Sequence, residues 1–200
     1  MRKGLLTTIL ILVLATGAFA QTAVYVGGGL SLPSGDLADG WKTGFGATGA
    51  IGITVAPSFQ IVPKVEFHTF GLDADKFLAE LEDVLGEDLN GVTIDGGSFS
   101  AIMFGADGRF AFGLPEAKMK PFVFGGLGMA IAKISDITAS YEGESETVLG
   151  TSETKLYFNF GAGIEFEASP TMNIFIQGRY VSISTEGSTT FMPLTVGLKF

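Results

Sequence analysis

Apolar and polar residues alternate along the last part of the chain. Counting back from Phe200 in steps of two, the apolar positions are Leu198, Val196, Leu194 and Met192. The positions between them are small or polar, namely Lys199, Gly197, Thr195 and Pro193. Because successive side chains of a strand point to opposite faces, this period of two predicts a strand with one apolar and one polar face.

The same alternation recurs along the chain and is clearest in segments 154–167 and 42–55. Segment 120–132 is apolar on both faces and segment 172–184 is mixed, so the pattern leaves their orientation open. A transmembrane strand needs about 9–11 residues, and single-chain bacterial barrels have an even number of strands. Eight segments of this kind can be drawn, at 22–32, 42–55, 60–70, 97–112, 120–132, 154–167, 172–184 and 190–200.

The connections between these segments are alternately long and short. The short ones cover 56–59, 113–119 and 168–171, and the mostly longer ones cover 33–41, 71–96, 133–153 and 185–189. In outer-membrane barrels the short turns face the periplasm and the long loops face outward. The sequence therefore predicts that both ends of the barrel lie in the periplasm.

The start of the chain has the pattern of an export signal. Arg2 and Lys3 precede an apolar run, and Ala18-Phe19-Ala20 has the small-x-small form of a cleavage site. A positively charged start, a short apolar stretch and such a site predict a secretory signal peptide. The run is too short to span a membrane as a helix, which takes about 20 apolar residues. We therefore expect residues 1–20 to be a signal peptide and residues 21–200 to form one domain.

Composition favours a barrel whose apolar side faces lipid. The mean hydropathy is +0.42, 16% of the residues are charged, 29 are glycine and none is cysteine. Only helices and closed barrels satisfy every backbone hydrogen-bonding group in hydrocarbon. We therefore predict an all-β fold, an eight-stranded antiparallel up-and-down transmembrane β-barrel, with inward glycines making room for larger lumen side chains.

Aromatic residues lie near the ends of the predicted strands, and this placement predicts the two interfacial girdles of a membrane barrel. On the outer side they are Trp41, Phe45, Phe99, Tyr157, Tyr180 and Phe191. On the periplasmic side they are Phe59, Phe110, Phe112, Phe122, Phe166 and Phe200.

Charged residues divide between the outer loops and the inward strand faces. Most of the 21 acidic residues fall in the predicted outer loops. A buried charge is tolerable when it is paired, and eight strands leave an interior just wide enough for side chains to fill. We therefore predict a lumen plugged by ion pairs, with a gated narrow conduit as the alternative, and expect Arg109→Ala to destabilise the barrel by a few kcal/mol. The predicted network comprises Lys64, Glu66, Asp107, Arg109, Glu165, Glu167, Arg179 and Lys199.

The 71–96 loop has the pattern of a short amphipathic helix. From Asp75 onward, apolar residues recur at helical spacing, with acidic residues on the other side. Asp73 or Asp75 can cap its start and Gly86 can end it. Its apolar stripe must pack on the barrel rim, the outer leaflet or a surface partner.

Other chemistry is weakly represented. The single histidine, His68, lies on a predicted inward face near the outer rim, and its simplest role is a hydrogen-bonded lumen residue. The sequence places no partner for a catalytic triad, which requires mutual geometry. We expect no enzymatic activity, no cofactor and no metal site, and the net charge of −9 argues against nucleic-acid binding.

With its terminal Val196-Gly197-Leu198-Lys199-Phe200 and the strand pattern above, the chain resembles the small outer-membrane β-barrel superfamily of OmpA-, OmpX- and OmpW-like proteins. The resemblance covers residues 21–200. It implies an integral outer-membrane protein with a structural or adhesive role, surrounded by outer-membrane lipids and lipopolysaccharide. It also implies insertion by the barrel-assembly machinery, with Phe200 as the assembly signal.

Two alternatives stay open at this stage. One is a narrow conduit for small hydrophobic solutes, which the resemblance implies for OmpW-like members. The other is a soluble periplasmic lipocalin-like barrel, which would turn the apolar faces inward and enclose a ligand cavity.

Overall fold

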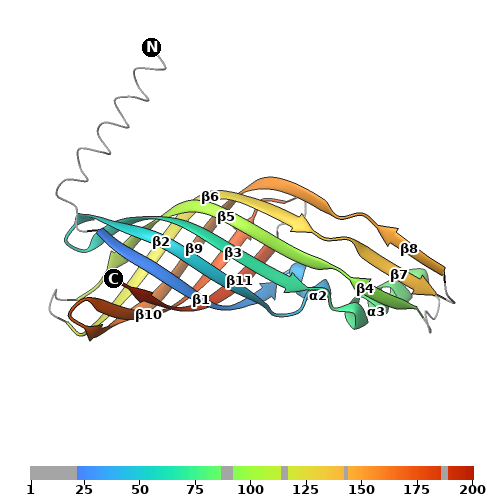
Figure 1. Ribbon diagram of the computed structural model, residues 1–200, viewed down its shortest axis with the longest axis horizontal. Coiled ribbons are helices and arrows are strands. Elements are labelled where there is room, and N and C mark those ends of the chain that lie inside the picture. Colours follow the sequence, from blue (N-terminus) through green and yellow to red (C-terminus); the bar gives the residue numbers. More distant parts are fainter. Residues whose placement is uncertain (1–21, 87–91, 114–116, 142–143, 186–188) are drawn as a thin grey trace, which may run out of the picture.

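Eight antiparallel strands close into a barrel (Figure 1). The computed structural model describes residues 22–86, 92–113, 117–141, 144–185 and 189–200. The expected signal peptide lies outside these residues. Around the barrel the strand order is β1-β11-β10-β9-β6-β5-β3-β2. The strands are β1 (Thr22–Ser34), β2 (Gly44–Ala56), β3 (Phe59–Gly71), β5 (Ser98–Ala111), β6 (Met119–Ile134), β9 (Thr151–Ser169), β10 (Met172–Ile183) and β11 (Thr189–Lys199).

The first and last strands complete the barrel. β1 pairs with β11 along its length, from Tyr25 opposite Lys199 to Ser34 opposite Thr190. Beyond this register, the Val24 amide donates to the Phe200 carbonyl at 3.0 Å and the Phe200 amide donates to the Val24 carbonyl at 2.9 Å. Closure leaves no unpaired edge along the wall, as a strand structure in hydrocarbon requires.

The apolar residues face outward. On β11, Met192, Leu194, Val196 and Leu198 are exposed, whereas Thr195 is buried in the lumen. The structure also determines the orientation of the two strands, β6 and β10, whose inward and outward faces could not be assigned from the sequence. On β6, Val123 and Met129 face outward and Phe122 faces inward, and on β10 the outward residues include Ile176. An apolar outer wall rules out the lipocalin-like arrangement.

The expected aromatic girdles are correct only in part. Phe45, with 66% of its surface exposed, and Phe110, with 43%, face outward as predicted. Four other aromatics are lumen residues, because they occupy inward positions of their strands: Phe99, Phe122, Tyr157 and Phe191. Nearness to a strand end did not distinguish the two faces.

A second, smaller sheet projects beyond the outer end of the barrel (Figure 1). Its strands are β4 (Thr93–Gly96), β7 (Ile137–Tyr141) and β8 (Glu144–Val148), in the order β4-β7-β8. β7 and β8 continue the β6–β9 hairpin outward, while β4 precedes β5 and is separated from it by Gly97. Gly96 and Gly97 both have positive φ, at 81° and 74°, a conformation that favours glycine. This outer sheet was not expected from the sequence.

Two helices lie at the same end. The short α2 covers Leu37–Gly40, and α3 covers Ala74–Leu85. Asp73 occupies the N-cap position of α3 without a side-chain capping bond, and Gly86 ends the helix in the left-handed region. The predicted loop helix is therefore present and ends where expected.

None of the helices in the described ranges is long and apolar enough to cross a membrane.

Candidate functional site

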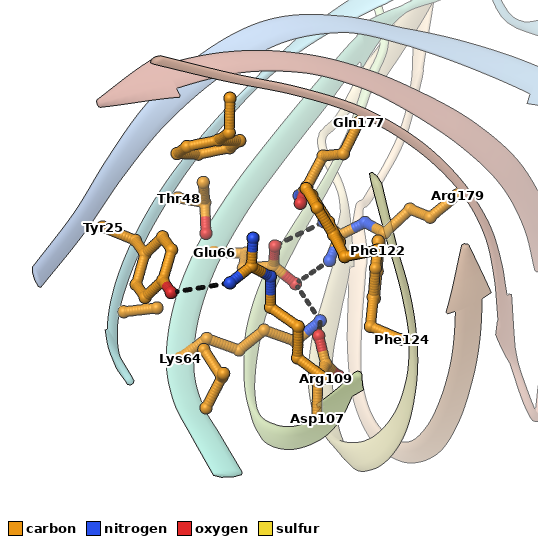
Figure 2. A pocket seen from close by; sticks show the side chains of 13 residues that line it. Tyr25, Thr48, Lys64, Glu66, Asp107, Arg109, Phe122, Phe124, Gln177 and Arg179 are labelled. Carbon is orange, nitrogen blue, oxygen red and sulfur yellow. Dashed lines mark hydrogen bonds and ion pairs between the residues drawn. The ribbon is translucent and has the colours of Figure 1, made fainter. Parts of the chain in front are cut away.

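A cluster of charged side chains crosses the middle of the lumen (Figure 2). Lys64 and Glu66 come from β3, Asp107 from the neighbouring β5, and Arg179 from β10 on the other side of the barrel. The Lys64 Nζ lies 2.7 Å from Asp107 Oδ2 and 3.3 Å from Glu66 Oε2. The Arg179 Nη1 donates to Glu66 Oε2 at 2.8 Å, and its Nη2 pairs with Oε1. We call these four residues the central cluster.

The central cluster is balanced and buried. It contains two positive and two negative side chains, each less than a tenth exposed. Asn159 of β9 lies beside it, since its amide nitrogen donates to Asp107 at 3.0 Å and its oxygen accepts from Lys64 at 3.4 Å. Buried ion pairs are stabilised when their remaining donors and acceptors are also satisfied. Asn159 does this for Lys64 and Asp107, whereas the buried Arg179 Nε has no hydrogen-bond partner among the described residues.

His68 lies just outside the central cluster, in the inward position expected for it. Its Nδ1 is 2.8 Å from the Ser31 hydroxyl, and its Nε2 faces Arg179 Nη2 at 3.4 Å. Ser31 is fully buried and His68 is 2% exposed. A catalytic triad would place a carboxylate on the second ring nitrogen, and this histidine has a guanidinium there.

A second group of charges occupies the end of the lumen nearest the short turns, which face the periplasm. Glu165 of β9 accepts from Lys199 at 2.6 Å through Oε1 and pairs with Arg109 through Oε2. The same Oε1 also accepts from the Asn173 side chain. We call Arg109, Glu165 and Lys199 the mouth cluster.

Two polar residues that the sequence did not single out complete the mouth cluster. Arg109 Nη1 donates to the Tyr25 hydroxyl at 3.0 Å and to the Gln60 side-chain oxygen at 3.1 Å. Its guanidinium also lies 3.9 Å from the centre of the Phe122 ring. Gln60 is the register partner of Arg109 in the β3–β5 pairing, whereas Tyr25 lies on β1 and meets Arg109 across the lumen. The alternation of the sequence gives neither the register nor the contacts across the lumen.

The structure brings together seven of the eight residues of the predicted network, in two clusters. The eighth, Glu167, is exposed near the periplasmic rim. Within the described residues, no ion pair joins Glu167 to the other seven. Conversely Lys120, which the sequence reading did not count, lies on the inward face of β6 and lines the same pocket as the mouth cluster. The sequence could have indicated this position, because Lys120 precedes the inward Phe122 by two residues and residues two apart on a strand share a face.

Apolar side chains fill the lumen on either side of the central cluster. Toward the outer end they include Phe70, Phe99, Met103, Tyr157 and Phe191, and toward the periplasm they include Val62, Phe122, Phe124 and Phe175. Glycines on the facing strands leave space for these rings. A Cβ at Gly197 would collide with the Phe175 ring, and one at Gly163 would collide with the Phe122 ring.

Little free space remains around the central cluster. The cavity beside it has a volume of about 40 Å³. Since a water molecule needs about 10–15 Å³ measured in this way, the cavity has room for about three waters. Figure 2 shows Lys64 and Glu66 of β3, Arg109 of β5 and Arg179 of β10 pointing into this space. The arrangement binds charged side chains to one another and leaves no room for a solute.

Comparisons with known proteins agree with this architecture. Residues 6–200 match the family model described as the outer membrane protein beta-barrel domain. No curated protein matches the chain by sequence. Among solved structures the chain is similar to Neisserial surface protein A, with a TM-score of 0.61 and 14% identity over 90% of this chain and 97% of that one.

Two further solved structures are similar at lower scores. Ail, the attachment invasion locus protein of Yersinia pestis, has a TM-score of 0.51 and 18% identity, over 90% of this chain and 97% of that one. A major outer membrane protein from Thermus thermophilus has a TM-score of 0.52 and 9% identity, over 90% and 99%. At these identities the similarity concerns the fold alone. The chain belongs to the outer membrane protein beta-barrel domain family, and it is an eight-stranded barrel of the outer membrane.

Proposed function

We propose that this protein is a non-conducting outer-membrane barrel with a structural and surface-interaction role. The observation that carries the proposal is the central cluster, in which Arg179, Glu66, Lys64 and Asp107 connect opposite walls of the lumen. Aromatic layers lie on both sides of the cluster. Opening a path would separate buried opposite charges, and removing one partner of such a pair costs about 3–5 kcal/mol.

Conductance in planar bilayers tests this proposal directly. Purified protein, refolded and inserted, is expected to give no discrete current steps at moderate voltage. Insertion is verified on the same samples by the mobility shift between unboiled and boiled protein on SDS gels. Reproducible steps from folded protein would contradict the sealed lumen.

The proposed interaction surface is the outer end, formed by α3 and the outer sheet. Every residue of β8 is exposed, and β8 pairs with β7 on one side only within the described residues. An exposed strand edge offers backbone groups to a partner strand. The 71–96 loop contributes α3 to this end. A surface partner was one of the three contacts expected from the sequence for the apolar stripe of this helix.

A deletion strain separates the structural role from the surface role. We expect loss of the protein to sensitise cells to detergent and to large antibiotics. The test is rescue by a barrel in which residues 137–148 are replaced by a short turn. Full rescue by this shortened barrel would assign the structural role to the barrel itself, and failure of a correctly folded one would assign it to the outer sheet.

The assembly machinery and lipopolysaccharide complete the proposed set of partners. Phe200 is 57% exposed and is held by backbone bonds to Val24, so its ring is available as an assembly signal. Phe200→Ala is expected to slow insertion by the purified assembly machinery and leave spontaneous refolding in detergent unchanged. An equal effect on both would assign Phe200 to barrel stability instead. For lipopolysaccharide, the expected result is tighter association with vesicles that contain it than with vesicles of neutral phospholipid.

The proposal includes no catalytic step. The serine and histidine that do meet, Ser31 and His68, are buried where a substrate has no access. We also propose no cofactor.

A conduit for small hydrophobic solutes is the second candidate, and one observation favours it. The outer mouth has a pocket of about 260 Å³ lined in part by Phe99, Ala132 and Ile134. Such a pocket suits a small apolar molecule. A conduit predicts that Phe99→Asp slows entry of a hydrophobic solute into vesicles that contain the protein, whereas a sealed barrel predicts no protein-dependent entry at all.

A further inference from the structure

Among the residues that the structure describes, the periplasmic mouth of the lumen has more positive than negative side chains. In the mouth cluster, Arg109 and Lys199 share one carboxylate, that of Glu165. The central cluster, by contrast, has one carboxylate for each cation. Both oxygens of Glu165 are occupied, because Asn173 donates to the one that also receives Lys199. Glu165 therefore has little capacity to neutralise a further cation.

Lys120 adds a further positive charge at the same place. It lines one pocket together with Arg109, Glu165 and Lys199. In the part of the chain that the structure describes, no ion pair is formed by its amino group. Lys118 and Glu167 line the adjoining pocket with it. Among the described residues that line the two pockets, four side chains are positive and two are negative.

The mouth also has space and hydrogen-bond donors for a ligand. Its pocket has a volume of about 270 Å³, against about 40 Å³ beside the central cluster. Thr54, Ser58 and Gln60 line it and supply polar groups. Because Lys120, Arg109 and Lys199 lie at inward positions of their strands, a ligand reaches them from the periplasm and not from the lipid.

We propose that the periplasmic mouth binds a small multivalent oxyanion, either phosphate or a carboxylate with several acidic groups, between Lys120 and Lys199. Charge-assisted hydrogen bonds from ammonium and guanidinium groups are the strong contacts for both anions. The acidic residues of the outer loops lie at the opposite end of the barrel, where salt screens them beyond about 10 Å. The proposal does not depend on whether the lumen conducts.

Backbone amide chemical shifts of the refolded protein in an uncharged detergent provide the test. Inorganic phosphate and tricarballylate are titrated separately at an ionic strength of about 0.1 M, at which charges more than about 10 Å away are screened. We expect saturable shifts in at least one titration, concentrated at residues 118–120, 165–167, 173 and 199. The anion that saturates at lower concentration identifies which of the two chemistries the mouth prefers.

Lys120→Gln and Lys133→Gln are matched variants on the same strand. Lys133 faces outward near the other end of β6 and is exposed, so its loss removes the same charge elsewhere. We expect Lys120→Gln to weaken binding at least about fivefold, as removal of a unit charge next to an anion should even in a solvated site. Lys133→Gln should leave binding unchanged. Equal weakening by both variants, or no saturable shift with either anion, would overturn the proposal.

Discussion

The central cluster and the mouth cluster are built from the same residue types and differ in their balance of charge. In the centre, two cations and two carboxylates pair at 2.7 to 3.3 Å or closer, with side chains at most 8% exposed. At the mouth, Lys199 is 20% exposed while Arg109 and Glu165 are as buried as the central residues, and the two cations share Glu165. The position along the lumen axis therefore decides how strictly charge must balance.

The physical reason for this difference is access to water. An unpaired charge in the middle of the lumen has only side chains and about three waters to solvate it, so its free-energy cost is high. At the mouth the periplasm solvates an excess charge, and its cost is correspondingly small. The mouth can thus hold positive charge for a ligand, whereas the centre can only hold charges for one another.

The largest effect is expected for Arg179→Ala. It leaves Glu66 and Asp107 sharing Lys64, in a region with little water. We predict a loss of about 3–5 kcal/mol in the free energy of unfolding, because a buried carboxylate loses its partner. Urea unfolding in lipid vesicles, followed by the fluorescence of the single tryptophan, measures it. A loss below about 1 kcal/mol, the range of exposed pairs, would contradict the central cluster as a buried network.

A smaller loss is expected for Arg109→Ala. Glu165 keeps both Lys199 and Asn173 as partners, and water reaches the mouth. We predict a loss of about 2 kcal/mol, between the values for exposed and fully buried pairs. The same urea experiment compares the two arginines side by side. If Arg109→Ala were as damaging as Arg179→Ala, the contrast between the two clusters would be wrong.

Packing around the central cluster is tested with two glycines. A Cβ at Gly126 would collide with the Asp107 carboxylate and the Ala106 carbonyl, while one at Gly49 would meet no atom within 4 Å. We expect Gly126→Ala to destabilise the barrel by about 1–3 kcal/mol, the usual cost of overpacking. Gly49→Ala serves as the matched control and should leave the unfolding midpoint nearly unchanged.

The smallest effect is expected for Glu167→Gln. Its side chain is exposed, in contrast to Glu165, which is buried two residues earlier on the same strand. The Glu167 substitution should leave the urea midpoint unchanged, and Glu165→Gln should lower it clearly because Arg109 and Lys199 lose their carboxylate. A clear drop with Glu167→Gln would show that the mouth cluster extends further than its ion pairs indicate.

Most of the fold follows from the period of two. The alternation from Met192 to Phe200 predicts both the strand and the side of it that faces lipid. All eight predicted segments are strands of the barrel in the structure. The outer sheet was not predictable, because β4, β7 and β8 are only four or five residues long and lie in polar, acidic surroundings. Their pairing depends on the β6–β9 hairpin continuing past the membrane.

The lumen residues were predictable as a set, but their partners were not. The alternation of the sequence alone places Lys64 and Glu66 on an inward face, whereas segment 172–184 is mixed and Arg179 was included without a clear orientation of its strand. The alternation does not say which strand of the opposite wall a side chain reaches. The Arg179–Glu66 pair and the bridging Asn159 could therefore be identified only from the strand register in the structure. The alternation also says nothing about how far a residue lies from the rim of the barrel. For this reason Glu167 was included in the predicted lumen network together with the buried charges.

Conductance of a matched pair of proteins tests the central claim most directly. The double variant Glu66→Ala/Arg179→Ala removes one pair and keeps Lys64 and Asp107 as a balanced pair. We predict that the unaltered barrel is silent in planar bilayers and that the folded double variant gives current steps. Steps of equal size from both proteins, or silence from both, would show that the central cluster is not what seals the lumen.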